Sequence, residues 1–135
     1  MSGYISQNLR SQIESIDHKC CCYCLTTEAN SGMPMTIDHI QPVSKGGLNT
    51  IENLCLACRT CNEYKSDTTE AIDPLTGELV ALFNPRQQNW KDHFQWNNDA
   101  SQVEGLTAIG RATVIALRMN NVVLSLIHIS QGIVR

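Results

Sequence analysis

The residues with the clearest chemical potential are concentrated between Asp38 and Asp67, in the stretch DHIQPVSKGGLNTIENLCLACRTCNEYKSD. An acid–histidine pair opens this stretch, and a Cys-x-x-Cys pair lies near its end. A second Cys-x-x-Cys pair lies just upstream. Two intervening residues are the usual spacing of a chelating loop that gives two thiolates to one tetrahedral zinc ion. The two pairs therefore predict a structural zinc site with the ligands Cys21, Cys24, Cys58 and Cys61.

The register of the first cysteine pair is not unique, because residues 20–24 read Cys-Cys-Cys-Tyr-Cys. The spacing selects Cys21 together with Cys24, but Cys20 or Cys22 can replace Cys21 as a ligand. Cys55 alternates with two leucines, as a strand residue does, and we do not expect it to bind metal.

Hard oxygen donors in the same stretch indicate a second kind of metal chemistry. Asp38 supplies a carboxylate and Asn62 an amide oxygen, which suit Mg²⁺ or Mn²⁺ better than zinc. His39 follows Asp38 on the opposite face of an extended strand, and an imidazole can accept a proton near neutral pH. Hydrolysis of a phosphodiester needs an activated water, a counter-charge for the phosphorane and help for the leaving oxygen. These three residues and one divalent ion can supply all of them.

Two strands and a turn must place Asp38 and His39. The β-branched residues of 36–40 predict a short strand, and residues 53–56 predict a second strand antiparallel to it. The sequence Ser44-Lys45-Gly46-Gly47 is typical of a turn in the connection between them.

A helix from about Cys58 to Ser66 must place Asn62. On a helix, Cys58, Cys61, Asn62 and Lys65 fall within one arc of roughly 100°. One helix can therefore anchor zinc through its first turn and offer Asn62 to a neighbouring site. A purely structural zinc site would not explain Asp38, His39 or Asn62.

Patterns in the rest of the chain predict packing elements. We expect a helix over 6–16 capped by Ser2 or Ser6, a loop over 26–35, a strand over 79–83, and a helix over 105–118 capped near Thr107. Residues 122–133 fit a helix or a strand equally well, and His128 within them is most simply a core or edge histidine. Trp90, His93, Phe94 and Trp96 form a cluster that we interpret as packing in preference to base stacking.

Composition limits the class of protein. The chain has 135 residues, seven cysteines and a net charge of −3, which is unusual for a nucleic-acid binder and predicts weak, salt-sensitive affinity. Residues 1–17 contain no uninterrupted apolar segment of the kind found in signal peptides, so we expect a reducing, cytoplasmic compartment and metal in place of disulfides. The longest apolar stretch, 122–129, is too short to span a bilayer, so no membrane association is expected.

These residues resemble the HNH endonuclease family. Its pattern runs from a C-x-x-C pair to D-H-I-x-P, then G-G, N-L and C-x-x-C-N-x-x-K. The corresponding positions here are Cys21–Cys24, Asp38–Pro42, Gly46-Gly47, Asn53-Leu54 and Cys58–Lys65.

The resemblance implies an α+β fold, with a ββα-metal finger, a four-cysteine structural zinc site, a helical N-terminal segment and a mixed, mainly helical C-terminal extension. It implies a metal-dependent DNA endonuclease or nickase. His39 would be the general base, Asp38 and Asn62 the ligands of a catalytic Mg²⁺ or Mn²⁺, and Asn53 a brace for the loop and for the orientation of the histidine. Lys65, and less strongly Arg59 and Lys45, would approach phosphates. We expect a single domain over 1–135, with the catalytic core at about 18–70 and the extension at about 71–135.

Two other functions stay open from the sequence. A non-catalytic zinc module that binds nucleic acid or a protein partner needs only the four cysteines. A redox-active dithiol at Cys21 and Cys24 is also conceivable, but no βαβ pattern surrounds that pair. The sequence does not decide between nicking and double-strand cleavage, and it leaves the oligomeric state open.

Overall fold

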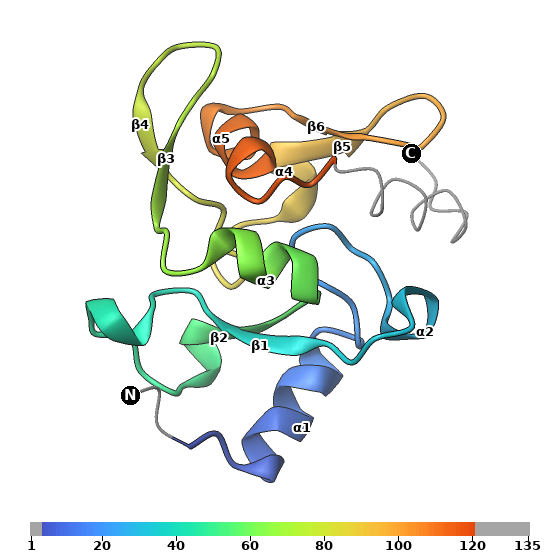
Figure 1. The fold of residues 1–135 in the computed structure, drawn as a ribbon, viewed down its shortest axis with the longest axis vertical. Coiled ribbons are helices and arrows are strands. Elements are labelled where there is room, and N and C mark those ends of the chain that lie inside the picture. Colours follow the sequence, from blue (N-terminus) through green and yellow to red (C-terminus); the bar gives the residue numbers. More distant parts are fainter. Residues whose placement is uncertain (1–3, 121–135) are drawn as a thin grey trace.

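The computed structural model describes residues 4–120, and the segments expected at 122–133, with His128, lie outside the described residues. The elements follow one another in the order seen in Figure 1. They are α1 (Gln7–Ile16), α2 (Glu28–Ser31), β1 (Thr36–His39), the 3₁₀ turns η1 (Val43–Lys45) and η2 (Ile51–Asn53), β2 (Leu54–Ala57), α3 (Arg59–Lys65), β3 (Glu70–Ile72), β4 (Leu79–Ala81), α4 (Trp90–His93), β5 (Phe94–Trp96), β6 (Val103–Gly105) and α5 (Ala108–Ala116). Within 4–120 no helix is long and apolar enough to cross a membrane.

A two-stranded antiparallel hairpin of β1 and β2 forms the centre of the fold, with Asp38 opposite Cys55 and His39 opposite Leu54. All four residues of β2 are buried, because α1 packs against this strand while α3 packs against β1. In Figure 1, α1 and α3 lie on opposite sides of the hairpin. The predicted strands and the predicted helix are confirmed to within one or two residues at their ends.

Helix caps agree with the sequence in two places. Ser6 is the N-cap of α1, where its hydroxyl accepts a hydrogen bond from the Leu9 amide, and Thr107 caps α5 in the same way through Gly110. The loop expected over 26–35 contains the four-residue helix α2, which Thr27 caps and Gly32 ends with a φ of 70°.

The part of the extension within the described residues contains two short hairpins, β3–β4 and β5–β6, besides α4 and α5. The extension was expected to be mainly helical, but its described residues form strands as well as helices. Each of the four strands has only three residues, and β3 and β4 are half-buried or exposed along their length. The strand expected over 79–83 is confirmed as β4, two residues shorter, whereas the other three strands are too short to leave a clear alternation in the sequence.

The aromatic residues of the extension pack on one another, as the sequence indicated. Phe94 makes an edge-to-face contact with Phe83 at 5.1 Å between ring centroids, and Trp90 lies 5.2 Å from Phe94 and 5.8 Å from Trp96. His93 belongs to this cluster, because its ring centroid lies 5.8 Å from that of Phe83. Its Nδ1 atom is 2.6 Å from the Thr107 hydroxyl. These contacts make the cluster part of the core.

Arg86 joins the extension to the N-terminal half. Its guanidinium donates to both carboxylate oxygens of Asp17 at 2.6 and 2.9 Å, and to the carbonyls of Ile51 and Leu54. The side chains of Arg86 and Asp17 are only 13% and 4% exposed, so this ion pair is shielded from water. Trp90 adds a second link by donating from its indole nitrogen to the Tyr23 carbonyl. We therefore propose that the core and the extension fold as one domain.

Replacing Arg86 by Met is expected to lower the free energy of unfolding by about 3–5 kcal/mol, because it leaves the buried Asp17 carboxylate without its charged partner and with only the Leu56 amide as a donor among the described residues. Arg59→Met is the control, since Arg59 and Glu63 form an ion pair that is about two-thirds exposed on each side and should contribute no more than about 1 kcal/mol. Denaturant unfolding curves of the two variants provide the comparison. Equal effects would show that Arg86 does not join the two parts.

Candidate active site and metal centre

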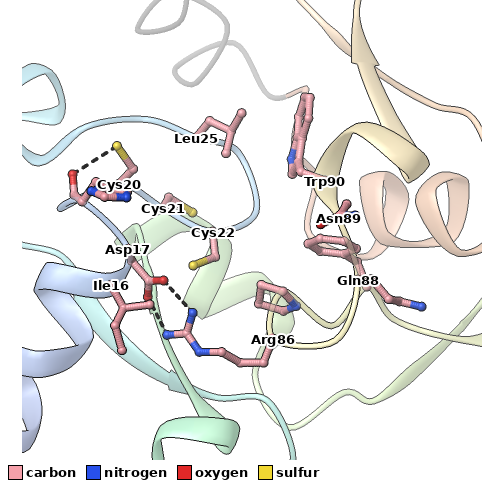
Figure 2. Close-up of a pocket in the computed structure, with 13 residues that line it drawn as sticks. Ile16, Asp17, Cys20, Cys21, Cys22, Leu25, Arg86, Gln88, Asn89 and Trp90 are labelled. Atoms are coloured by element: carbon pink, nitrogen blue, oxygen red, sulfur yellow. Dashed lines mark hydrogen bonds and ion pairs between the residues drawn. The ribbon is translucent and has the colours of Figure 1, made fainter.

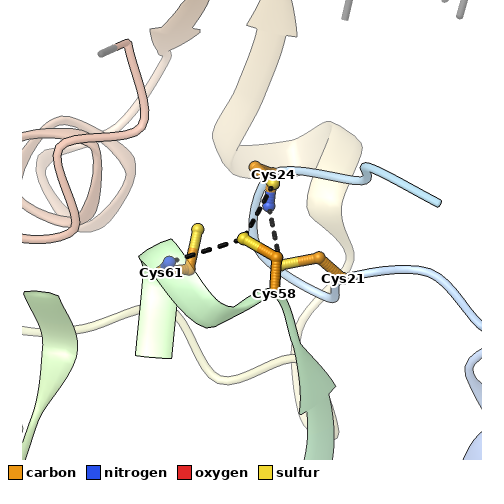
Figure 3. A group of neighbouring side chains, drawn as sticks. All are labelled: Cys21, Cys24, Cys58 and Cys61. Atoms are coloured by element: carbon orange, nitrogen blue, oxygen red, sulfur yellow. Dashed lines mark hydrogen bonds between the residues drawn. The ribbon is translucent and has the colours of Figure 1, made fainter. Parts of the chain in front are cut away.

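Four buried sulfur atoms meet where the 21–24 loop approaches the start of α3. The Sγ atoms of Cys21, Cys24, Cys58 and Cys61 all lie within 4.8 Å of one another, and Figure 3 shows them converging on one point. Cys20, Cys22 and Cys55 are not part of this group. The structure thus brings together the register that the spacing selected, and the cluster can hold a zinc ion.

Backbone amides support both cysteine pairs in the same way. The Cys21 sulfur accepts from the amides of Tyr23 and Cys24, and the Cys58 sulfur accepts from the amide of Cys61, each at 3.4 Å. The Cys58 interaction also makes this residue the N-cap of α3. Amide donors of this kind stabilise the thiolate form that a metal ligand requires.

The four thiols cannot all ionise by themselves. Hydrogen bonds from the neighbouring thiols lower the pKa of Cys58 far below its usual range, whereas burial raises the pKa of Cys24 and the interactions with Cys21 raise that of Cys61. Thiolates this close together repel one another, so they do not all ionise without a compensating positive charge. A divalent cation among the sulfurs would remove this conflict, which supports a metal at this position.

Asp38, His39 and Asn62 line one cavity of about 300 Å³. It lies between β1, α3 and the turn that begins at Pro42. Neighbouring residues on a strand point to opposite faces, but both can reach a cavity that borders the edge of that strand. The other lining residues are Ile37, Pro42, Val43, Ser44 and Ser66.

The His39 ring is oriented by Asn49. The Nε2 atom of His39 lies 2.6 Å from the Asn49 amide oxygen, and the Asn49 amide nitrogen donates to the Tyr4 carbonyl. This second bond fixes which end of the amide faces the ring, so Nε2 must carry the proton. Nδ1 is then the nitrogen that can accept one.

Asp38 is 3% exposed and its carboxylate is held from two sides. The Tyr23 hydroxyl donates to Oδ2 at 2.7 Å, and the Lys65 ammonium lies 3.2 Å from Oδ1 and 3.1 Å from Oδ2. Burial raises the pKa of Asp38, and the charge of Lys65 and the hydrogen bond from Tyr23 oppose that rise. Burial also keeps Tyr23 protonated, because it raises the tyrosine pKa well above its usual value.

Comparison with known proteins agrees with this arrangement. Residues 21–68 match the family model described as HNH endonuclease. This segment is an HNH domain. No curated protein and no solved structure matches the chain significantly. The HNH domain contains both cysteine pairs, the β1–β2 hairpin and α3, and it indicates nuclease activity in general.

One predicted phosphate contact of the HNH domain needs correction. Lys65 is 1% exposed, and its ammonium contacts the Asp38 carboxylate and the carbonyls of His39 and Ile40. Lys65 lies on the face of α3 that is turned toward the hairpin. Its ammonium therefore pairs with Asp38 inside the domain and is not available to DNA. Arg59 is exposed on α3 and pairs with Glu63, and Lys45 is exposed in η1.

Asn53 braces the loop of the HNH domain but does not contact the histidine ring. Its amide oxygen accepts from the Gln41 amide, and its amide nitrogen donates to the carbonyls of Gln41 and Leu48. A Cβ atom on Gly47 would lie 1.7 Å from the Gln41 carbonyl oxygen, so only glycine fits in this turn. Sequence reasoning missed Asn49, whose only signal was a polar residue between the glycine pair and Asn53.

Tyr23 is the second residue of the site that the sequence did not reveal. It lies between Cys21 and Cys24 in the sequence and is fully buried. The available signal was an aromatic residue with a hydroxyl at this position.

A second cavity lies beside Arg86 and Trp90 (Figure 2). It is lined on one side by Cys20, Cys21 and Cys22.

We expect Cys61→Ser to lose bound zinc and to abolish cooperative unfolding, because structural zinc supplies folding free energy directly. Cys20→Ser is the matched control, since the sulfur of Cys20 lies outside the cluster and contacts the His18 carbonyl. Elemental analysis should give about one zinc per chain for the wild type and the control. Folded Cys61→Ser protein with a full complement of zinc would contradict this assignment.

Proposed function

We propose that the chain is a metal-dependent nuclease that hydrolyses phosphodiester bonds of DNA, as an endonuclease or a nickase. The observation that carries this proposal is the cavity lined by Asp38, His39 and Asn62, which collects a carboxylate, an imidazole and an amide beside an HNH-type hairpin and helix. In this proposal, β1, β2 and α3 act as a ββα-metal finger. A non-catalytic zinc module has no use for these three side chains together, and no observation favours it.

His39 is the general base in this proposal. Asn49 holds the Nε2 proton, so Nδ1 takes a proton from the attacking water. The same contact fixes the plane of the ring, which keeps the accepting lone pair in a constant direction.

Asp38 and Asn62 hold the catalytic Mg²⁺ or Mn²⁺. Their oxygen donors fit these ions, which bind through few protein ligands, whereas the four sulfurs fit zinc. When bound, the ion supplies charge for the developing phosphorane and for the leaving oxygen. The Asn62 amide nitrogen donates to the Thr36 hydroxyl at 3.0 Å, so its oxygen is the atom left for a cation.

Lys45 and Arg59 are the candidates for phosphate contacts, since both are exposed on elements that flank the cavity. With a net charge of −3, the chain should bind DNA weakly and lose affinity steeply as salt increases.

Replacing His39 by Ala is expected to lower the cleavage rate about 10²–10⁴-fold, because no proton acceptor replaces Nδ1. Zinc content and thermal stability should stay near wild type. Plasmid relaxation and linearisation with Mg²⁺, Mn²⁺ or EDTA measure the effect. The control is His18→Asn, an exposed histidine with a φ of 54°, which asparagine tolerates.

Two results would count against this mechanism. Undiminished cutting by the His39→Ala variant would keep a nuclease but remove His39 as the base. Wild-type protein that binds DNA and never cuts it with any divalent ion would leave a binding module.

Asn62→Ala should raise the Mg²⁺ or Mn²⁺ concentration needed for half-maximal cleavage by about 10-fold or more, because it removes one oxygen ligand. Zinc content should not change. Glu63→Ala is the control on the same helix, since Glu63 is exposed and pairs only with Arg59 among the described residues. An unchanged metal dependence in Asn62→Ala would exclude the residue from the cation site.

A further inference from the structure

The structure connects the sulfur cluster to Asp38 through one side chain. Tyr23 lies between Cys21 and Cys24 in sequence, and its hydroxyl donates to Asp38 Oδ2 at 2.7 Å. We propose that Tyr23 is a positioning residue, through which the zinc-binding loop sets the orientation of the carboxylate that binds the catalytic cation. This inference rests on the proposed function, because the role of the Tyr23 hydroxyl depends on Asp38 being a ligand of the catalytic cation.

Tyr23 has no freedom to move apart from the sulfur cluster. Its amide donates to the Cys21 sulfur at 3.4 Å, and its carbonyl accepts from the Trp90 indole at 2.7 Å. The side chain is fully buried, and the Cys55 thiol lies 3.7 Å from its hydroxyl. A displacement of the 21–24 loop would therefore displace the phenol oxygen by a similar amount.

The contacts of Lys65 and Tyr23 with Asp38 have different effects on the carboxylate. The Lys65 ammonium contacts both carboxylate oxygens, so it compensates the buried charge but fixes the rotation of the group only weakly. The Tyr23 hydroxyl contacts Oδ2 alone, at 2.7 Å, and the Cys55 thiol lies 3.9 Å from the same oxygen. Tyr23 is therefore the closer of the two donors that distinguish Oδ2 from Oδ1. Oδ1 is contacted by Lys65 alone among the described residues, so it retains acceptor capacity for a cation.

The effect of such a positioning residue on metal affinity can be measured. Groups that hydrogen-bond to metal ligands typically change metal affinity 10–100-fold when they are removed. Removing the Tyr23 hydroxyl should therefore weaken Mn²⁺ binding by this factor. Zinc binding should not change, because none of the four cluster sulfurs contacts that hydroxyl.

The test is Tyr23→Phe in the zinc-loaded protein. Isothermal titration calorimetry with Mn²⁺ and without DNA should show binding 10–100-fold weaker than wild type. Zinc content and thermal unfolding should stay near wild type. In cleavage assays, the Mn²⁺ concentration for half-maximal rate should rise by the same factor, while the rate at saturating Mn²⁺ should change less.

Tyr64→Phe is the matched control, because Tyr64 is 42% exposed on α3 and its ring keeps its contact with Arg118 as phenylalanine. Asn62→Ala gives the reference value for a lost ligand. Wild-type Mn²⁺ affinity in Tyr23→Phe would overturn the inference and leave the proposed function intact. Loss of zinc or of folding in Tyr23→Phe would also overturn it, because the hydroxyl would then be needed for the fold itself. Wild-type protein that neither binds Mn²⁺ nor cuts DNA would remove the proposed function, and this inference with it.

Discussion

A charged carboxylate buried on the central hairpin is the constraint on which this structure depends. Asp38 is 3% exposed, and its charge is compensated by Lys65, the last residue of α3. The same ammonium contacts the carbonyls of His39 and Ile40 and so joins the end of the helix to the end of β1. Removing either partner alone would leave an unpaired charge in the core, which is among the most costly changes in a small domain.

The other end of α3 is fixed by different chemistry. Cys58 caps the helix and Cys61 lies in its first turn, so the sulfur cluster holds the start of α3 against the 21–24 loop. The helix has only seven residues and would be unstable alone. Because it is held at both ends, Asn62 between them has a defined place beside β1. A rigid cavity can thus be built from short elements.

The sequence allowed the central parts to be predicted because strong local signals mark them. Cysteine spacing, the β-branched residues of β1 and the capping residues Ser6 and Thr107 each act within a few positions. In the extension, the strand expected over 79–83 is present as β4, but its partner β3 and the β5–β6 hairpin were missed, since strands of three residues have little periodicity. Contacts with α5 support β3, β4 and β6.

Side-chain partners within the site were the least predictable. The arc of α3 was correct, but whether Lys65 faces water or protein depends on a hairpin distant in sequence. The contact of Asn49 with His39 depends on the path of the 41–48 loop, which Asn53 and Gly47 set. Tyr23 meets Asp38 only because the 21–24 loop folds over β1. Such pairings follow from tertiary packing, which a pattern along the chain does not encode.

The bond between Asp17 and Arg86 spans 69 positions of the chain, and this separation has a consequence for synthesis. Ribosomes release the N-terminal part first, and domains begin to form as they emerge. Cys61 completes the set of four sulfurs while Arg86 has still to be translated, 25 residues later. The four sulfurs that could hold zinc therefore leave the ribosome before the guanidinium that pairs with Asp17 at the C-terminal end of α1. The order of translation separates the appearance of the complete sulfur set from the final closure of the domain.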